Sequence, residues 1–192
     1  MERPINSIYH QLRYILPLWF VQLITAWLPD NKFTIRFRGV LVSPFIGKCG
    51  KNFTLAGGVV INGPQGLNVG DNVYFARGTW INAKAGIYIE DNVLFGPNVV
   101  ISSAQHVFKD GSFASGQNIY RPITIGEGSW LAANVTVKCG VKLGKGNLVA
   151  SNSSVVSDTP DYYLVAGVPA QPVKPVSERD GEAFTGVIPK RS

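Results

Sequence analysis

Histidine and cysteine are scarce in this chain of 192 residues, which has two of each. Cys49 and Cys139 lie far apart, so the sequence contains neither the spacing of a cysteine-based metal site nor that of a redox motif. The low count also argues against a disulfide-stapled secreted domain. We therefore expect a reduced, intracellular protein with two small packed thiols. Its 45% hydrophobic and 16% charged residues predict a globular chain.

A long apolar run is also missing. The stretch YILPLWFVQLITAWL, residues 14–28, is shorter than the ~20 residues of a spanning helix and lacks a small-residue cleavage site. Its apolar residues recur every three or four positions and predict an amphipathic helix over residues 5–28, kinked at Pro17. The apolar positions are Ile5, Ile8, Leu12, Ile15, Trp19, Leu23 and Trp27. Two interpretations stay open: this face packs on the rest of the protein, or it lies in a membrane interface.

Acidic residues are few at the start of the chain. Residues 1–51 contain only Glu2 and Asp30, against seven basic residues: Arg3, Arg13, Lys32, Arg36, Arg38, Lys48 and Lys51. Most of the overall net charge of +6 therefore lies there. Such a segment suits an anionic membrane surface or an acidic partner, or is a solvated basic surface.

A period of six residues dominates the rest of the sequence. From Ile125 the blocks IGEGSW, LAANVT, VKCGVK, LGKGNL, VASNSS and VVSDTP follow without a gap, each opening on an aliphatic residue. The same period runs through VGDNVY, FARGTW and INAKAG from Val69, and through IEDNVL, FGPNVV and ISSAQH from Ile89. Six is wrong for a helix but suits a short strand plus a turn. Three blocks make one coil, and the stacked coils form a solenoid.

These blocks, together with the closing segment VVSDTPDYYLVAGVPAQPVK, resemble the hexapeptide-repeat acyltransferases. The nearest resemblance is to maltose and galactoside acetyltransferases and to bacterial polysaccharide O-acetyltransferases. It implies an all-β fold, a left-handed parallel β-helix with an N-terminal amphipathic helix and a loop excursion at about 107–122. The expected organisation is a helical, basic segment over 1–44, the β-helix domain over 45–175 and a tail over 176–192.

The resemblance also implies how such a protein works. It implies an acetyl-coenzyme A-dependent O-acetyltransferase, a homotrimer with sites at subunit interfaces, and a sugar acceptor. We expect a surface-polysaccharide or lipid-linked glycan precursor as the acceptor, a cytoplasmic protein with possible membrane contact through residues 1–40, and neither a metal nor a nucleic-acid partner.

His106 stands where the repeat stops, directly before the insertion VFKDGSFASGQNIYRP. Long loops on rigid scaffolds often carry function, although a lone histidine is more often structural. The family places its catalytic histidine just before this loop, so the resemblance makes His106 the general base. Val107 follows it where Pro or Asp is usual. The resemblance also makes Asp110 a candidate to orient the imidazole, with a backbone carbonyl as the alternative.

Other site residues follow from the resemblance alone. Trp130 is expected near acyl donor and acceptor, while Asn82 and Arg121 are expected at the acceptor. Ala133 and Ser151 are expected to line the coenzyme A groove, and Lys174 to bind its phosphates. Ser157 and Gln171 replace the usual Lys and Arg, so Lys138, Lys142 or Lys145 are alternative phosphate ligands.

Several other functions of related folds require features that this sequence does not contain. A γ-class carbonic anhydrase shares the prism but needs three histidines on its metal. A nucleotide-sugar pyrophosphorylase needs a further domain, and a serine acetyltransferase needs a large N-terminal helical domain. A xenobiotic acetyltransferase and a non-catalytic scaffold remain as alternatives.

Overall fold

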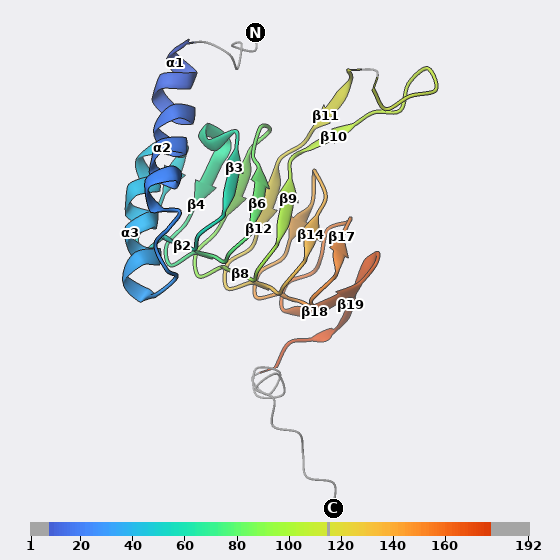
Figure 1. Ribbon diagram of the computed structural model, residues 1–192. Coiled ribbons are helices and arrows are strands. Elements are labelled where there is room, and N and C mark those ends of the chain that lie inside the picture. Colours follow the sequence, from blue (N-terminus) through green and yellow to red (C-terminus); the bar gives the residue numbers. More distant parts are fainter. Residues whose placement is uncertain (1–7, 115, 178–192) are drawn as a thin grey trace, which may run out of the picture.

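The computed structural model describes residues 8–114 and 116–177, and Figure 1 shows helices at one end of a solenoid of about six turns. The predicted left-handed parallel β-helix is confirmed. Apart from Val176 and Ser177, the predicted tail over 176–192 lies outside the described residues, as do residues 1–7 of the predicted N-terminal segment. The solenoid strands run from Lys48 to Pro175.

Three parallel sheets form the sides of the solenoid. Sheet A contains β1 (Lys48–Cys49), β4 (Leu67–Val69), β7 (Ile87–Ile89), β12 (Ile123–Ile125) and β15 (Lys142–Leu143). Sheet B contains β2 (Thr54–Leu55), β5 (Tyr74–Phe75), β8 (Leu94–Phe95), β13 (Trp130–Leu131), β16 (Leu148–Val149) and β18 (Tyr163–Gly167), with β19 (Ala170–Pro175) added antiparallel. Sheet C contains β3 (Val60–Asn62), β6 (Trp80–Asn82), β9 (Val100–Ser102), β14 (Thr136–Val137) and β17 (Ser154–Val155).

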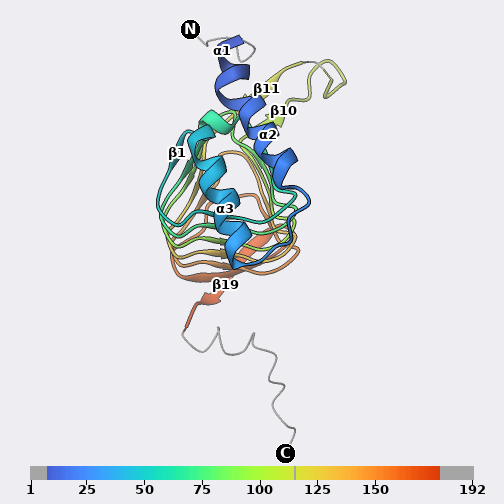
Figure 2. The same ribbon diagram turned by 60° about the vertical axis from the view of Figure 1, so that its left-hand side comes forward.

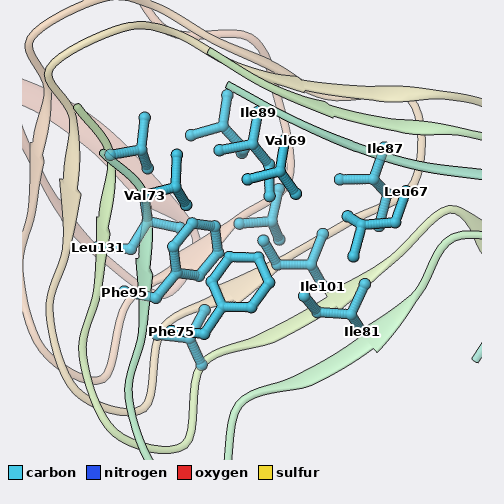
Figure 3. Packing of buried hydrophobic residues seen from close by; sticks show 14 of the residues in the cluster. Leu67, Val69, Val73, Phe75, Ile81, Ile87, Ile89, Phe95, Ile101 and Leu131 are labelled. Carbon is cyan, nitrogen blue, oxygen red and sulfur yellow. The ribbon is translucent and has the colours of Figure 1, made fainter. Parts of the chain in front are cut away.

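The leading aliphatic residue of each block points into the prism, as the period predicts. Ile81, Ile101 and Leu131 are fully buried, and Figure 3 shows such side chains stacked coil upon coil. Phe75 packs edge-to-face between two other aromatic rings, with its ring centroid 5.1 Å from that of Phe53 and 4.8 Å from that of Phe95. Each coil is therefore stabilised by the coils above and below it.

The connection from sheet C to sheet A differs in length from coil to coil. From Val137 to Leu143 the step takes the basic six residues, but it takes eight from Ile81 to Ile89. From Ile101 to Ile125 it takes twenty-four, because a hairpin leaves the prism there. Its strands are β10 (Ala104–His106) and β11 (Asn118–Tyr120), which pair antiparallel. The excursion thus starts earlier than predicted, and His106 lies on the projecting arm instead of on the coil.

The N-terminal segment forms two helical stretches where one helix over 5–28 was predicted. The first comprises α1 (Ile8–His10), the π-helical turn η1 (Gln11–Ile15) and α2 (Leu16–Thr25), with Pro17 in the first turn of α2. The second is α3 (Lys32–Val42), which was not predicted as a separate helix. It begins at Lys32 because the Asn31 side chain accepts the N–H groups of Phe33 and Thr34 in a capping box. Short 3₁₀ turns follow at η2 (Ser43–Phe45) and η3 (Pro64–Gly66).

The helices cover the open end of the first coil, and Figure 2 shows α2 and α3 lying across it. The buried face of α2 carries Leu18, Val21 and Thr25. The apolar stripe predicted from the sequence points the other way, since Leu12, Trp19 and Leu23 are all more than half exposed. The helix therefore packs on the solenoid through the face that the sequence pattern did not select.

Candidate functional site

His106 lies at the outer end of β10, directly opposite Asn118 of β11. Its side chain is exposed, and the next hairpin rung is the Val107 N–H donating to the Gln117 carbonyl at 3.1 Å. The strand pair holds the backbone of His106 at a fixed distance from the prism. An imidazole in this position is open to a molecule approaching from outside the chain.

Asp110 lies beyond the paired part of the hairpin, in a tight turn. Its φ is +51°, and Lys109 and Ser112 flank the turn with two mutual backbone hydrogen bonds of 3.0 Å. Within residues 8–114 and 116–177, no hydrogen bond or ion pair joins Asp110 to His106. The structure therefore places the two on the same arm, and the orienting role of Asp110 stays a prediction.

Arg121 lies at the base of the hairpin, where the chain returns to the prism. Its backbone N–H donates to the Ser103 carbonyl at 3.1 Å, and its aliphatic stem lies against Gly140. A small pocket of about 220 Å³ opens beside it, also lined by Gln105, Lys138 and Asp158. The pocket has two cationic side chains and one carboxylate, so it suits a polar ligand with some anionic character.

Asn82 occupies the same rung position on sheet C as Asn62 and Ser102, one coil before the hairpin. Its Nδ2 donates to the Ser102 Oγ at 3.5 Å, and Ser102 in turn donates to the Ala104 carbonyl at 2.9 Å. Its Oδ1 is buried and has no hydrogen-bond partner among the described residues. Sequence reasoning missed Ser102, although its place in the ISSAQH block matches that of Asn82 in INAKAG.

An apolar groove of about 480 Å³ runs over sheet B and its corner toward sheet C. Three of the four predicted coenzyme residues, Trp130, Ala133 and Ser151, line it. Small residues at the corner between sheets B and C leave the space that the groove occupies. The remaining lining residues are Tyr74, Ala76, Leu94, Phe95, Gly96, Pro97, Ala132, Leu148 and Ala150.

Lys174 extends the same sheet toward the C-terminal end. Trp130 pairs with Leu148, Leu148 with Leu164, and Leu164 with Lys174, so the four residues form one row across neighbouring strands. Adjacent strands lie about 4.8 Å apart. Lys174 is exposed and lies beyond the groove lining.

The alternative phosphate ligands lie elsewhere. Lys138 lines the pocket beside Arg121, and Lys142 is exposed on sheet A. The Lys145 Nζ lies 3.5 Å from a Glu127 carboxylate oxygen and 3.9 Å from one of Glu90. None of the three lines the groove over sheet B.

Tyr74 was missed in the sequence, although it holds in VGDNVY the place of Leu94 in IEDNVL and Trp130 in IGEGSW. It lines the groove, and burial together with the nearby Asp30 charge raises the pKa of its hydroxyl. Burial would raise the pKa of Asp30 as well. Hydrogen bonds from the Gly57 N–H, Arg38 and Arg77 outweigh it and hold that pKa below its usual value.

His106 and the groove lie on different sides of one chain. The hairpin leaves from the corner between sheets C and A, which is the edge of a triangular prism opposite sheet B, as Figure 1 shows. A site that used both would need two copies of the chain. Among the described residues, no group of three or more His, Cys, Asp or Glu could hold a metal ion.

Comparison with known proteins gives matches over most of the chain and matches over short stretches of it. The chain is 31% identical over 153 residues to WcaF of Escherichia coli K12, an acetyltransferase named for colanic acid biosynthesis. That match covers 79% of this chain and 81% of WcaF. The chain is also 34% identical over 59 residues to galactoside O-acetyltransferase of Escherichia coli K12, covering 31% of this chain and only 29% of that protein. The other first-ranked local matches likewise span less than a third of the curated relatives. No family model matches.

Among solved structures, a hexapeptide-repeat acetyltransferase from Vibrio cholerae, complexed with acetyl-coenzyme A, superimposes with a TM-score of 0.79. It is 23% identical, and the match covers 92% of this chain and 94% of that one. At this identity the likeness concerns the fold.

Proposed function

The chain belongs to the hexapeptide-repeat acetyltransferase family, and on that premise we propose that it transfers an acetyl group from acetyl-coenzyme A to a sugar hydroxyl. The observation that carries most weight is the exposed His106 at the outer end of β10, on the hairpin that leaves the solenoid. The other histidine, His10, lies on the helical segment and is therefore a poor candidate for the same task.

His106 acts as the general base. A sugar hydroxyl is a weak nucleophile at neutral pH, and an imidazole can accept its proton as the oxygen attacks the thioester carbonyl. The new C–O bond forms, the C–S bond breaks, and the imidazolium returns the proton to the departing thiolate. Acetyl passes directly from donor to acceptor, so no nucleophilic side chain is needed. Asp110 orients the imidazole, an assignment that rests on the family pattern.

Acetyl-coenzyme A lies in the groove over sheet B. The apolar walls around Trp130 suit the pantetheine arm, while Ala133 and Ser151 leave room along the corner. Lys174, further along the same row of strands, provides a positive charge for the coenzyme phosphates.

The active unit is a homotrimer with three sites between subunits. Because His106 and the groove face away from each other in one chain, a ring lets the hairpin of one subunit meet the groove of the next. The hairpin leaves between β9 and β12, close to the level of Trp130 along the solenoid. A ring that joins them turns about an axis roughly parallel to the solenoid.

The acceptor is a glycan, namely a surface-polysaccharide or lipid-linked precursor at the cytoplasmic face of a membrane. The WcaF name refers to colanic acid biosynthesis, and the galactoside enzyme's name specifies O-acetylation of a sugar. Arg121 and Asn82, at the base of the hairpin and one coil before it, contact this acceptor.

An acceptor screen with acetyl-coenzyme A and a thiol reagent tests the proposal. Free thiol released with a mono- or oligosaccharide, absent without it, supports sugar O-acetylation. Turnover on aminoglycosides or other xenobiotics alone would reassign the substrate. Coenzyme A binding without turnover on any hydroxyl acceptor, or no binding at all, would contradict the proposal.

A further inference from the structure

The helical segment has two apolar faces, and only one of them is used by the fold. The inner face packs Leu18, Val21 and Val42 onto the open end of the solenoid, where Gln22 also donates to the Val59 carbonyl at 2.9 Å. Through this contact the helices cover the apolar core at the open end of the solenoid. The apolar residues on the opposite face of the helices take no part in it.

The opposite face is what we call the outer cap face. Its residues on and after α2 are Trp19, Phe20, Leu23, Ile24 and Trp27, and those on α3 are Phe33, Phe37 and Val40. Trp27 is 79% and Phe33 76% exposed, and the rings of Phe33 and Phe37 stack in parallel with centroids 6.2 Å apart. Single exposed apolar side chains are ordinary, but eight large ones on or directly after two neighbouring helices point to a binding surface.

The surroundings of the outer cap face are cationic. Lys32 and Arg36 lie on α3, and Arg13 lies on the π-helical turn η1, where its guanidinium donates to the Pro44 carbonyl at 2.7 Å. Asp30 is the single acidic residue between positions 8 and 51, and its carboxylate is bound by Arg38 and Arg77. A hollow of about 430 Å³ opens beside Val40 at the edge of the face, lined also by Arg36, Ser43 and Lys51. Its size and charge suit an anionic headgroup, although Asp71 accepts the Lys51 backbone N–H nearby.

We propose that the outer cap face docks on an anionic lipid bilayer. Exposed tryptophan and phenylalanine beside arginine and lysine are the composition of helices that lie in a membrane interface. A two-fold contact between copies would place these cations against themselves. No described helix is long and apolar enough to cross a bilayer, so the helices lie on the surface. Figure 2 shows both lying across the end of the solenoid, as flat docking requires.

The inference rests on the proposed function in one respect, the placing of a membrane-linked acceptor near the site. In the proposed ring, with its axis roughly parallel to the solenoid, all three outer cap faces point to the same side. Three weak contacts then act together, which raises the apparent affinity well above that of one face.

Vesicle co-sedimentation of the full chain tests the surface. Vesicles of phosphatidylcholine with phosphatidylglycerol should bind the protein, pure phosphatidylcholine should bind it more weakly, and high salt should reduce the difference. Trp19→Ser with Leu23→Ser should lower binding by about tenfold or more, and Arg36→Gln with Lys51→Gln should remove the preference for the anionic lipid. Val173→Ser and Lys84→Gln, exposed residues on the solenoid, are matched controls and should bind as the parent does.

Fluorescence provides a second readout. In a Trp80→Phe, Trp130→Phe background only Trp19 and Trp27 emit, and their emission should shift to the blue and be quenched by brominated lipid. The inference is wrong if the parent binds no vesicle or if the cap variants bind vesicles as well as the parent does. It is also wrong if the cap variants differ from the parent only in that a larger oligomer dissociates. His106→Ala should bind vesicles fully, so a loss of acetyl transfer and a loss of docking are separable.

Discussion

The side chain of Arg121 lies across Gly140, so that a Cβ atom added at Gly140 would stand 3.1 Å from Cδ of the arginine. Arg121 lies at the base of the hairpin, where the fourth coil begins. Gly140 lies at the corner from sheet C to sheet A where that coil ends. Gly140 also has a φ of +84°, which a residue with a side chain rarely adopts. The glycine thus leaves the space in which the Arg121 stem lies.

This contact predicts that Gly140→Ala and Arg121→Ala both weaken acceptor use. We expect Arg121→Ala to lower kcat/KM for the glycan about tenfold, with little change in the KM for acetyl-coenzyme A. Gly128→Ala is the matched control, because its φ is +71° but no side chain stands within 4 Å. Both glycine variants should cost about 1 kcal/mol of stability, and only Gly140→Ala should raise the acceptor KM. Equal kinetic effects would refute the positioning role.

His106→Ala should lower acetyl transfer by about 100-fold or more, which is the usual contribution of a general base. The side chain is exposed, so the thermal unfolding midpoint and coenzyme A binding should stay unchanged. His10→Ala is the control and should turn over a soluble acceptor normally. Unchanged turnover in His106→Ala would overturn the assignment.

Trp130→Ala should raise the KM for acetyl-coenzyme A by about tenfold, because the indole forms a wall of the groove over sheet B. Tyr88→Ala removes a similarly exposed aromatic ring from the outer face of sheet A and should leave that KM unchanged. Isothermal titration with coenzyme A gives the same comparison without turnover. Equal affinity in both variants would place the donor elsewhere.

Mixing two impaired variants, assayed at acetyl-coenzyme A well below its KM, tests whether the site spans two subunits. If each site takes His106 from one subunit and Trp130 from the next, co-expressed His106→Ala and Trp130→Ala chains form some intact sites. Random trimers at equal amounts should recover about a quarter of the parent activity. If one chain holds the whole site, the mixture stays at the level of the two variants.

Asp30 predicts a stability difference that depends on pH. Its pKa is lowered in the folded protein, so its contribution is complete above the unfolded value near ~3.9 and is lost as pH falls through the folded value. Asp30→Asn should cost about 2 kcal/mol at pH 7, because Arg38 is buried and loses its ion pair. The gap should close in strong acid. Glu127→Gln, at an exposed ion pair, should cost well under 1 kcal/mol.

The sequence predicted the solenoid because its signal is local and repeated. Each block places an aliphatic residue such as Ile81 or Leu131 inward, and many in-register copies leave little room for another period. It also predicted that the chain leaves the prism near His106, since only there does the six-residue step fail for so long. The predicted Ala133 and Ser151 share one groove because they hold the same place in blocks one coil apart, and Trp130 lies in the strand directly before that corner.

Only the tertiary structure decided the rest. The sequence pattern selected one apolar face of the N-terminal helix as the buried one. Because this helix is apolar on several sides, its sequence does not determine which side packs inward. The structure shows that Leu18 and Val21 are buried. The sequence could not place Lys174 in one row with Trp130, because strand pairing joins residues far apart in the chain. Nor could it show that His106 and the groove lie on opposite sides, since only the closure of three sheets into a prism fixes which edge lies opposite which face.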